Sequence, residues 1–342
     1  MPILLGVGVK KLIIQMPCYN EAETLATALG ALPREVEGFD VVEWLIIDDG
    51  SVDETSAVAR RCGVNHVIRH RTNQGLARAF MTGIQACLER GADVIVNTDA
   101  DNQYNADDIP KLTAPVLQGN ADLVIGARPI SSIEHFSSLK KRLQNLGSWV
   151  VRAASKTDVP DAPSGFRAFS RDAARNMVVF TEYTYTLETI IQAGHKNMAI
   201  TSVPVRVNED LRPSRLMRSI PSYIARSVWT ILRVLVIYQP FRFFATLGIL
   251  IFAGGVLLGL RFLYLHFTGQ SLGNVQSLIL AGSMLVVGFQ TVLIAFVTDL
   301  LAANRKMLEE IRSHALALRF DGAESSRFDG HAEAEHDPTG DQ

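Results

Sequence analysis

The sequence contains few cysteines and almost no net charge. Its three cysteines, Cys18, Cys62 and Cys87, are far apart and form no C-x-x-C pair. This spacing argues against a zinc site and a disulfide scaffold, and it suits a reducing cytosol. The formal net charge of −2 provides no protein-wide basic field of the kind that binds nucleic acid. Residues 1–9 lack the basic segment of a signal peptide, so we expect no cleaved leader.

Apolar residues, by contrast, make up 48% of the chain and form two long segments towards its C-terminal end. Residues 243–260 are apolar or small throughout, residues 278–301 are nearly so, and each segment is long enough to cross a bilayer. Basic residues flank the outer ends of the pair and the connecting residues 268–274 are uncharged, which predicts that both outer ends face the cytoplasm. A helical hairpin in the core of a soluble protein is the alternative.

Two further segments flank the apolar pair. Residues 216–240 mix arginines with aromatic and aliphatic residues, which predicts helices in the membrane interface or an amphipathic helix packed on the preceding domain. Residues 304–342 are poor in apolar side chains from Phe320 onward, so we expect a cytosolic, largely disordered tail. The predicted organisation is therefore a catalytic domain at 1–215, interfacial helices, two transmembrane helices at 241–303 and the tail.

Polar side chains follow three apolar segments, residues 11–16, 41–47 and 93–96, which are typical of buried parallel strands. The polar residues in question are Tyr19 and Glu21, Asp48 and Asp49, and Asp99 and Asp101. Because the carboxyl ends of parallel strands meet at one edge of a sheet, we expect these side chains to lie close together. Such a cluster of carboxylates would repel itself unless a cation and hydrogen-bond donors lay among them.

The third of these loops offers ligands for a metal ion. Asp99 and Asp101 are one residue apart, and Gln103 can add an amide oxygen. Mg²⁺ or Mn²⁺ prefers oxygen ligands of this kind when substrate phosphates complete its coordination. The alternative is a turn rich in Asp and Asn that caps the next helix.

Four motifs follow one another along the first part of the chain. They are Pro17-x-Tyr19-Asn20-Glu21, Asp48-Asp49-Gly50-Ser51-x-Asp53-x-Thr55, Asn73-x-Gly75-x-x-x-Ala79 and Asp99-Ala100-Asp101-x-Gln103. In this order they resemble family 2 glycosyltransferases of GT-A fold, and most of all the dolichyl- and polyprenyl-phosphate sugar synthases. The resemblance covers about residues 10–215 and implies an α/β fold with a Rossmann-like mixed or parallel sheet and flanking helices.

The resemblance also implies which residues bind a nucleotide-sugar donor. The residues at the strand ends that it places around the nucleotide are Pro17, Tyr19, Glu21, Asp48, Asp49, Asp99 and Ala100. Arg206, Arg212 and Arg215 match a mobile basic loop that closes over the diphosphate in this family. Pro213 stands where that loop usually has glycine, which puts the flexibility of the loop in doubt.

An acceptor site is implied in the same way. Arg128 and Arg142 match arginines that contact a lipid phosphate, and arginine suits that role because it binds phosphate with two parallel hydrogen bonds. The resemblance places Asp161, Ser164 and Glu188 near the acceptor, with Asp161 as the catalytic base or an acceptor-orienting carboxylate and Asp101 as its partner in catalysis. Alternatively, Arg142 belongs to a solvated helix face or contacts anionic lipid, and Asp161 only starts a turn.

The expected function is transfer of a sugar, with inversion, from a UDP- or GDP-sugar to undecaprenyl or dolichyl phosphate at the cytoplasmic membrane face. The product would be a lipid-linked sugar for glycan or cell-envelope assembly. The expected cofactor is Mg²⁺ or Mn²⁺. The expected partners include a second copy of the chain, in a homo-oligomer. Three other readings are weaker: a different lipid or saccharide acceptor, an inactive membrane adaptor with this fold, and a cytosolic nucleotidyltransferase. A processive polysaccharide synthase is disfavoured because the chain lacks a Gln-x-x-Arg-Trp motif.

Overall fold

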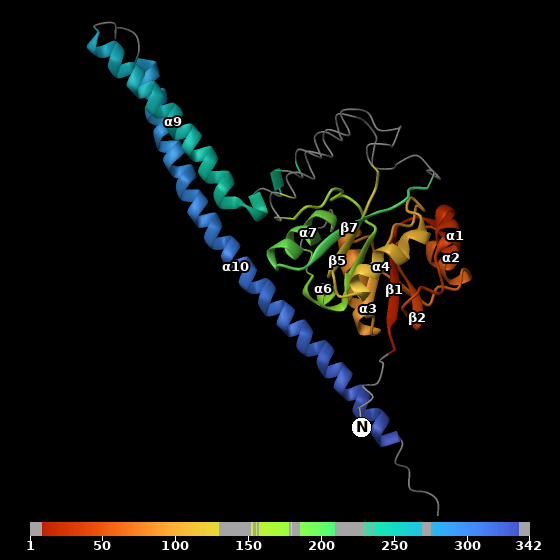
Figure 1. Ribbon diagram of the computed structural model, residues 1–342. Helices are drawn as coiled ribbons and strands as arrows, with labels where there is room; N and C mark the ends of the chain where they lie inside the picture. Colours follow the sequence, from red (N-terminus) through yellow and green to blue (C-terminus); the bar gives the residue numbers. More distant parts are fainter. Residues whose placement is uncertain are drawn as a thin grey trace, which may run out of the picture. The chain divides into compact units, whose positions relative to one another are not determined.

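The structure is a computed structural model that describes residues 9–129, 152, 155, 157–177, 179, 185–208, 229, 232–233, 236–268 and 275–334. The chain divides into two compact units, one formed by Met1–Ile220 with Arg312–Gln342 and the other by Pro221–Ile311. A sheet flanked by helices forms the first unit, and two long helices dominate the second (Figure 1).

Seven strands form one mixed sheet in the order β3-β2-β1-β4-β6-β5-β7. The strands are β1 (Lys11–Cys18), β2 (Val41–Asp48), β3 (His66–Arg69), β4 (Val94–Asn97), β5 (Leu123–Ala127), β6 (Arg167–Ser170) and β7 (Ile200–Pro204). β1 is parallel to β2 and β4, β2 to β3, and β5 to β7, whereas β6 is antiparallel to both β4 and β5. The mixed sheet confirms the predicted fold class, and β1, β2 and β4 are the three strands predicted from their apolar residues.

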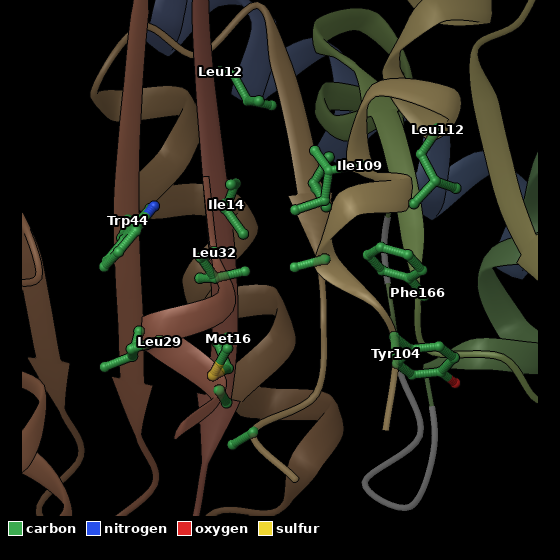
Figure 2. Close-up of a cluster of buried hydrophobic side chains, with 14 of the residues drawn as sticks. Leu12, Ile14, Met16, Leu29, Leu32, Trp44, Tyr104, Ile109, Leu112 and Phe166 are labelled. Carbon is green, nitrogen blue, oxygen red and sulfur yellow. The ribbon is translucent and has the colours of Figure 1, made fainter. Parts of the chain in front are cut away.

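Helices cover both faces of this sheet. They are α1 (Ala22–Ala31), α2 (Thr55–Arg61), α3 (Leu76–Glu89), α4 (Ile109–Leu117), α6 (Arg171–Asn176) and α7 (Thr186–His195), with a 3-10 turn η1 (Ala106–Asp108) before α4. Because side chains alternate along a strand, Leu12, Ile14 and Met16 of β1 face the same way. Figure 2 shows them in one cluster with Leu29 of α1 and Ile109 of α4. These side chains form the apolar core on that face of the sheet.

The opposite face of β1 is covered by α3 and contains polar groups. A Cβ placed on Gly83 of α3 would meet the side chains of Gln15 and Ile47, so the helix lies directly on the strands there. Gln15 is fully buried, and its Nε2 donates to Oδ1 of Asn97, the last residue of β4, at 3.0 Å. A hydrogen bond between buried amides therefore joins β1 to β4 beneath the carboxyl edge of the sheet.

The second unit contains the helix α9 (Pro240–Phe267) and, up to Ile311, the helix α10 (Val275–Ala334); α9 runs beside the first part of α10 (Figure 1). Both are long and apolar enough to cross a membrane, over Pro240–Phe267 and Val275–Leu308. Their backbones approach closely at glycines: a Cβ on Gly255 would be 2.9 Å from the backbone N of Leu285, and one on Gly288 would be 2.5 Å from that of Phe252. Small residues at such crossings are typical of paired transmembrane helices.

The end of α10 differs from the sequence-based expectation. We predicted a largely disordered tail from Phe320, but α10 continues to Ala334. Ala, Leu, Glu and Arg predominate in residues 301–318 and favour helix, and extending an existing helix adds a hydrogen bond for each residue ordered. The predicted interfacial helices at 216–240 lie mostly outside the described residues, although Tyr238 does contact α10, where the guanidinium of Arg305 lies 4.9 Å from its ring centroid.

Candidate active site

The loop after β1 is joined to the loop after β2 by hydrogen bonds. The N–H of Asn20 donates to Ser51 Oγ, and Oδ1 of Asn20 accepts the N–H of Val52, both at 2.9 Å. Asp53 accepts the N–H of Ala22 at 3.1 Å. Asn20 has φ of +54°, a left-handed conformation that asparagine tolerates better than most residues. The ends of β1 and β2 therefore form one continuous surface, as their parallel pairing predicts.

Asp48, expected at the donor site, is fully buried and shapes the turn after β2. Its carboxylate accepts the N–H of Ser51 at 2.8 Å and the hydroxyl of Ser56. Gly50 in the same turn has φ of +74°, and a Cβ there would be 2.6 Å from the carbonyl carbon of Thr72. The turn requires glycine for both reasons, and Asp48 stabilises it from below.

Asp49, also expected at the donor site, holds the loop that precedes α3. Its Oδ1 accepts the N–H of Gln74 at 2.9 Å, and its Oδ2 accepts the N–H of Gly75 at 2.8 Å. His70 binds Oδ1 through Nδ1 at 2.7 Å, and its other ring nitrogen lies 3.1 Å from the hydroxyl of Thr82. The Asp49 side chain is only 4% exposed. Its hydrogen bonds to the backbone therefore position this loop. Sequence reasoning missed His70, which no motif marks.

Carboxylates from all three strand ends lie near the buried thiol of Cys18. The thiol of Cys18, buried at the end of β1, has its pKa raised by burial and by the charges of Glu21, Asp48 and Asp99. Burial and the neighbouring Asp101 raise the pKa of Asp99 to about 7. A concentration of negative charge at one edge of a sheet favours binding of a cation.

The remaining donor-site candidates divide by their exposure. Tyr19 is 42% exposed at this edge, where a ligand can reach its ring. Glu21 is half-buried, and its Oε2 accepts the hydroxyl of Thr24 at 2.9 Å. Pro17 and Ala100 are buried, so only their backbones could meet a ligand.

The predicted metal loop has a defined backbone. Oδ1 of Asp101 accepts the N–H of Gln103 at 3.0 Å, and Asp99 lies close enough to Asp101 for the two charges to interact. Within the described ranges, no three His, Cys, Asp or Glu side chains are placed to share a metal ion. The predicted ligands number only two carboxylates, with the amide of Gln103 as the third group.

Gly165, just before β6, packs directly against this loop. Its N–H donates to the hydroxyl of Tyr104 at 3.0 Å, and its C=O accepts Nδ2 of Asn97 at 2.8 Å. A Cβ at Gly165 would be 2.8 Å from Oδ2 of Asp99 and 2.9 Å from the hydroxyl of Tyr185. Only glycine therefore fits between the metal loop and the loop that carries Asp161.

Arg128 and Asp161, both expected at the acceptor site, bind each other. Nε and Nη2 of Arg128 donate to the two carboxylate oxygens at 2.7 and 3.0 Å, and its backbone N–H donates at 3.2 Å. The side chains are 11% and 1% exposed. Burial alone would lower the pKa of Arg128, but Tyr104 and the Asp161 carboxylate raise it. The predicted base is thus engaged by the predicted phosphate ligand.

Arg167, the first residue of β6, organises the same loop, a role that was not predicted from the sequence. Its fully buried guanidinium donates to the carbonyls of Ala162, Ser164 and Thr186, each at 2.7 Å. Burial lowers its pKa to about 10. The acceptor candidates Ser164 and Glu188 are both buried, on the loop and the helix that Arg167 joins.

The other basic candidates are less informative. Arg206, expected to close over a diphosphate, instead directs Nε and Nη2 to Oδ1 of Asp108 at 3.2 and 3.0 Å. Although burial opposes the shift, these bonds lower the pKa of Asp108. Arg142, Arg212 and Arg215 lie outside the described residues, so their roles stay predictions.

Known proteins share this sequence pattern. Residues 13–178 match the model of Glycosyl transferase family 2. Undecaprenyl-phosphate mannosyltransferase from Micrococcus luteus is 30% identical over 212 residues, which are 59% of this chain and 85% of the relative. UDP-N-acetylglucosamine--dolichyl-phosphate N-acetylglucosaminyltransferase from Methanococcus voltae is 29% identical over 219 residues, which are 58% and 85% of the two chains.

Solved structures share the fold. Glucosyl-3-phosphoglycerate synthase from Mycobacterium tuberculosis with phosphoglyceric acid has a TM-score of 0.51 at 20% identity, over 66% of this chain and 79% of that one. The same enzyme with Mn²⁺, UDP and phosphoglyceric acid has a TM-score of 0.50 at 18% identity, over 66% and 78%. From its family match and its relatives, this chain belongs to glycosyl transferase family 2.

Proposed function

We propose that this glycosyltransferase transfers a sugar from a nucleotide-sugar donor to a polyprenyl phosphate at the cytoplasmic face of a membrane. The observation that carries the proposal is the packing of Gly165 against Asp99. This packing brings two loops together. One is the acidic loop of Asp99, which is suited to a metal-bound diphosphate, and the other is the loop of Asp161, whose carboxylate binds Arg128. A donor and an anionic acceptor bound to these two loops would be neighbours.

On the donor side, the residues fit a hard divalent cation, Mg²⁺ or Mn²⁺. Asp99, Asp101 and Gln103 offer only oxygen atoms as ligands. The raised pKa of Asp99, caused by burial and by Asp101, marks a place where a positive charge would be stabilising. When bound, the cation would neutralise the diphosphate that leaves as the glycosidic bond breaks. The Mn²⁺ and UDP of the fold neighbour from M. tuberculosis are consistent with this assignment.

On the acceptor side, Arg128 supplies the positive charge. Asp161 accepts from Nε and Nη2 of Arg128. Nη1 forms no hydrogen bond with the described residues, so it can bind a phosphate oxygen while the ion pair persists. We infer that Asp161 orients Arg128 and that the lipid phosphate, already a nucleophile, attacks without a strong base. A single displacement inverts the anomeric carbon, from an α-linked donor to a β-linked product. Arg142 would be a second phosphate ligand.

The relatives and the hairpin support a lipid acceptor. The two relatives from M. luteus and M. voltae are named for transfer to undecaprenyl phosphate and dolichyl phosphate. Large apolar side chains such as Leu250, Leu257 and Leu300 are more than half exposed on α9 and α10, a surface that lipid would cover. We therefore propose that this enzyme is a two-span protein of the cytoplasmic membrane.

The proposal is tested by product analysis. Membranes containing the protein are incubated with a panel of UDP- and GDP-sugars and undecaprenyl phosphate, and the lipid extract is analysed by mass spectrometry and by NMR of the anomeric proton. We expect a single sugar on the lipid phosphate in β linkage. Sugar on a saccharide or another lipid would replace the acceptor, and an α-linked product would exclude single displacement.

Membrane orientation is tested by cysteine labelling. In a Cys62→Ala background the two remaining cysteines, Cys18 and Cys87, are buried. We expect Ser271→Cys to react with an impermeant thiol reagent added to intact cells and Ser325→Cys to react only after lysis. The reverse pattern would place the catalytic domain away from cytosolic nucleotide sugars.

A further inference from the structure

Asn208 binds three consecutive peptide carbonyls of the metal loop. Its Nδ2 donates to the C=O of Asn102 at 2.9 Å and to that of Tyr104 at 3.3 Å, and its backbone N–H donates to the C=O of Gln103 at 2.9 Å. The neighbouring Val207 forms a β-bridge with Tyr104. The chain after β7 therefore lies along the metal loop and is bonded to every residue from Asn102 to Tyr104.

The loop needs such support because its backbone is not regular. Asn102 has φ of +58°, a left-handed conformation that costs free energy in residues other than glycine. In loops that belong to no strand or helix, carbonyls require other donors. A single side-chain amide with two hydrogens on one nitrogen can serve two carbonyls, which here are those of Asn102 and Tyr104.

The peptide unit between Asn102 and Gln103 defines the geometry of Asp101. Its N–H, that of Gln103, donates to Oδ1 of Asp101, and its C=O, that of Asn102, accepts from Nδ2 of Asn208. Holding this peptide in place leaves Oδ2 of Asp101 as the oxygen that is not bonded to the loop. Asn208 thus acts on the carboxylate through one peptide unit.

We propose that Asn208 is a positioning residue for the divalent-cation site of Asp99, Asp101 and Gln103, an inference that rests on the function proposed above. It touches neither donor nor acceptor. It orients the loop so that the carboxylate oxygen and the Gln103 amide point to one cation without rearrangement when the cation binds. Residues behind metal ligands commonly have this effect on affinity.

The test compares Asn208→Ala with Asn105→Ala. Asn105 directly follows the metal loop, and its side chain accepts the N–H of Asp107 at 3.0 Å. The control variant therefore also loses one local hydrogen bond, but none to residues 102–104. Binding of Mn²⁺ in the presence of UDP is measured on the full-length protein in detergent by electron paramagnetic resonance of free Mn²⁺. We expect Asn208→Ala to bind Mn²⁺ at least about tenfold more weakly than the wild type, within the usual range for such residues. Asn105→Ala should bind Mn²⁺ with wild-type affinity.

A second variant covers the case in which Asn208→Ala does not fold. Asn208→Ser keeps one hydroxyl donor and can serve only one carbonyl, so an intermediate loss of Mn²⁺ affinity is expected. Equal affinity in wild type and a folded Asn208 variant would overturn this inference alone. Absence of Mn²⁺ binding by the wild-type protein would overturn it together with the metal assignment of the proposed function.

Discussion

The guanidinium of Arg128 and the carboxylate of Asp161 form a two-bond ion pair, with Nε–Oδ2 and Nη2–Oδ1 distances of 2.7 and 3.0 Å. Their positions in the chain are separated by a segment that includes Arg142. A pair of this geometry fixes the plane of the guanidinium. It therefore determines the direction from which an acceptor phosphate can reach the arginine.

A double-mutant cycle on this pair separates orientation from proton transfer. Charged hydrogen bonds contribute about 1.5–3 kcal/mol, so Arg128→Ala and Asp161→Ala should each lower kcat/KM for the lipid about tenfold to a hundredfold. If Asp161 acts through Arg128, the double variant is no worse than either single variant. Multiplied effects, together with loss of a basic limb from the pH–rate profile in Asp161→Ala, would instead identify Asp161 as an independent base.

Gly165→Ala should impair catalysis more than folding. The added methyl would lie within 2.9 Å of the Asp99 carboxylate and the Tyr185 hydroxyl, so the metal loop must shift. Displacements of about 1 Å can lower turnover by roughly 10²-fold, and we expect a loss of this order in kcat. Gly30→Ala in α1, where a Cβ meets nothing within 4 Å, is the control and should keep full activity. Unchanged kcat in Gly165→Ala would contradict the close packing.

Removal of the metal or its ligands should abolish transfer. We expect EDTA to stop product formation and Mn²⁺ or Mg²⁺ to restore it, because two clustered carboxylates are poor ligands for a diphosphate without a cation. Asp101→Ala and Gln103→Ala should lower turnover by orders of magnitude without a large change in melting temperature, since both side chains are at a partly exposed loop. Asp107→Ala, an exposed neighbour, serves as the comparison. Normal activity in EDTA would refute the metal site.

The hairpin should be sensitive to side-chain volume at Gly288 but not at Gly282. A Cβ at Gly288 would be 2.5 Å from the backbone N of Phe252, whereas one at Gly282 meets nothing within 4 Å. Overpacking costs about 1–3 kcal/mol, so Gly288→Leu should lower the melting temperature in detergent, followed by circular dichroism, and Gly282→Leu should not. Equal melting temperatures would mean that the helices do not cross at Gly288.

The sequence was sufficient to predict β1, β2, β4 and the meeting of their acidic ends, because runs of β-branched residues and the motifs after them are local signals. The antiparallel direction of β6 could not be predicted in this way. Strand direction depends on pairing with β4 and β5, whose partners are distant in sequence, such as Asn97 with Arg167. The α-helical continuation to Ala334 was not predicted because the segment is poor in apolar residues, which favours disorder, whereas a helix already formed favours its own extension.

Residue roles were harder to predict than positions. Asp48 and Asp49 were correctly placed at the end of β2, but their bonds to Ser51 and to the Gln74–Gly75 peptides depend on turns whose shape a motif does not state. His70 and Asn208 escaped notice because each acts through contacts with residues distant in sequence. A charged or amide side chain in an unremarkable sequence context gives no indication of what it will contact.

The position of β6 between β4 and β5 also has a consequence for the order of folding. β4 and β5 are not hydrogen-bonded to each other and are joined only through β6. Until the chain has been synthesised past Ser170, each of these strands has an open edge, and Gly165 has no fixed place beside Asp99. Contacts between residues so far apart in sequence form slowly. The amino-terminal part of this domain would therefore leave the ribosome with an unpaired strand edge, the kind of surface that chaperones protect from aggregation.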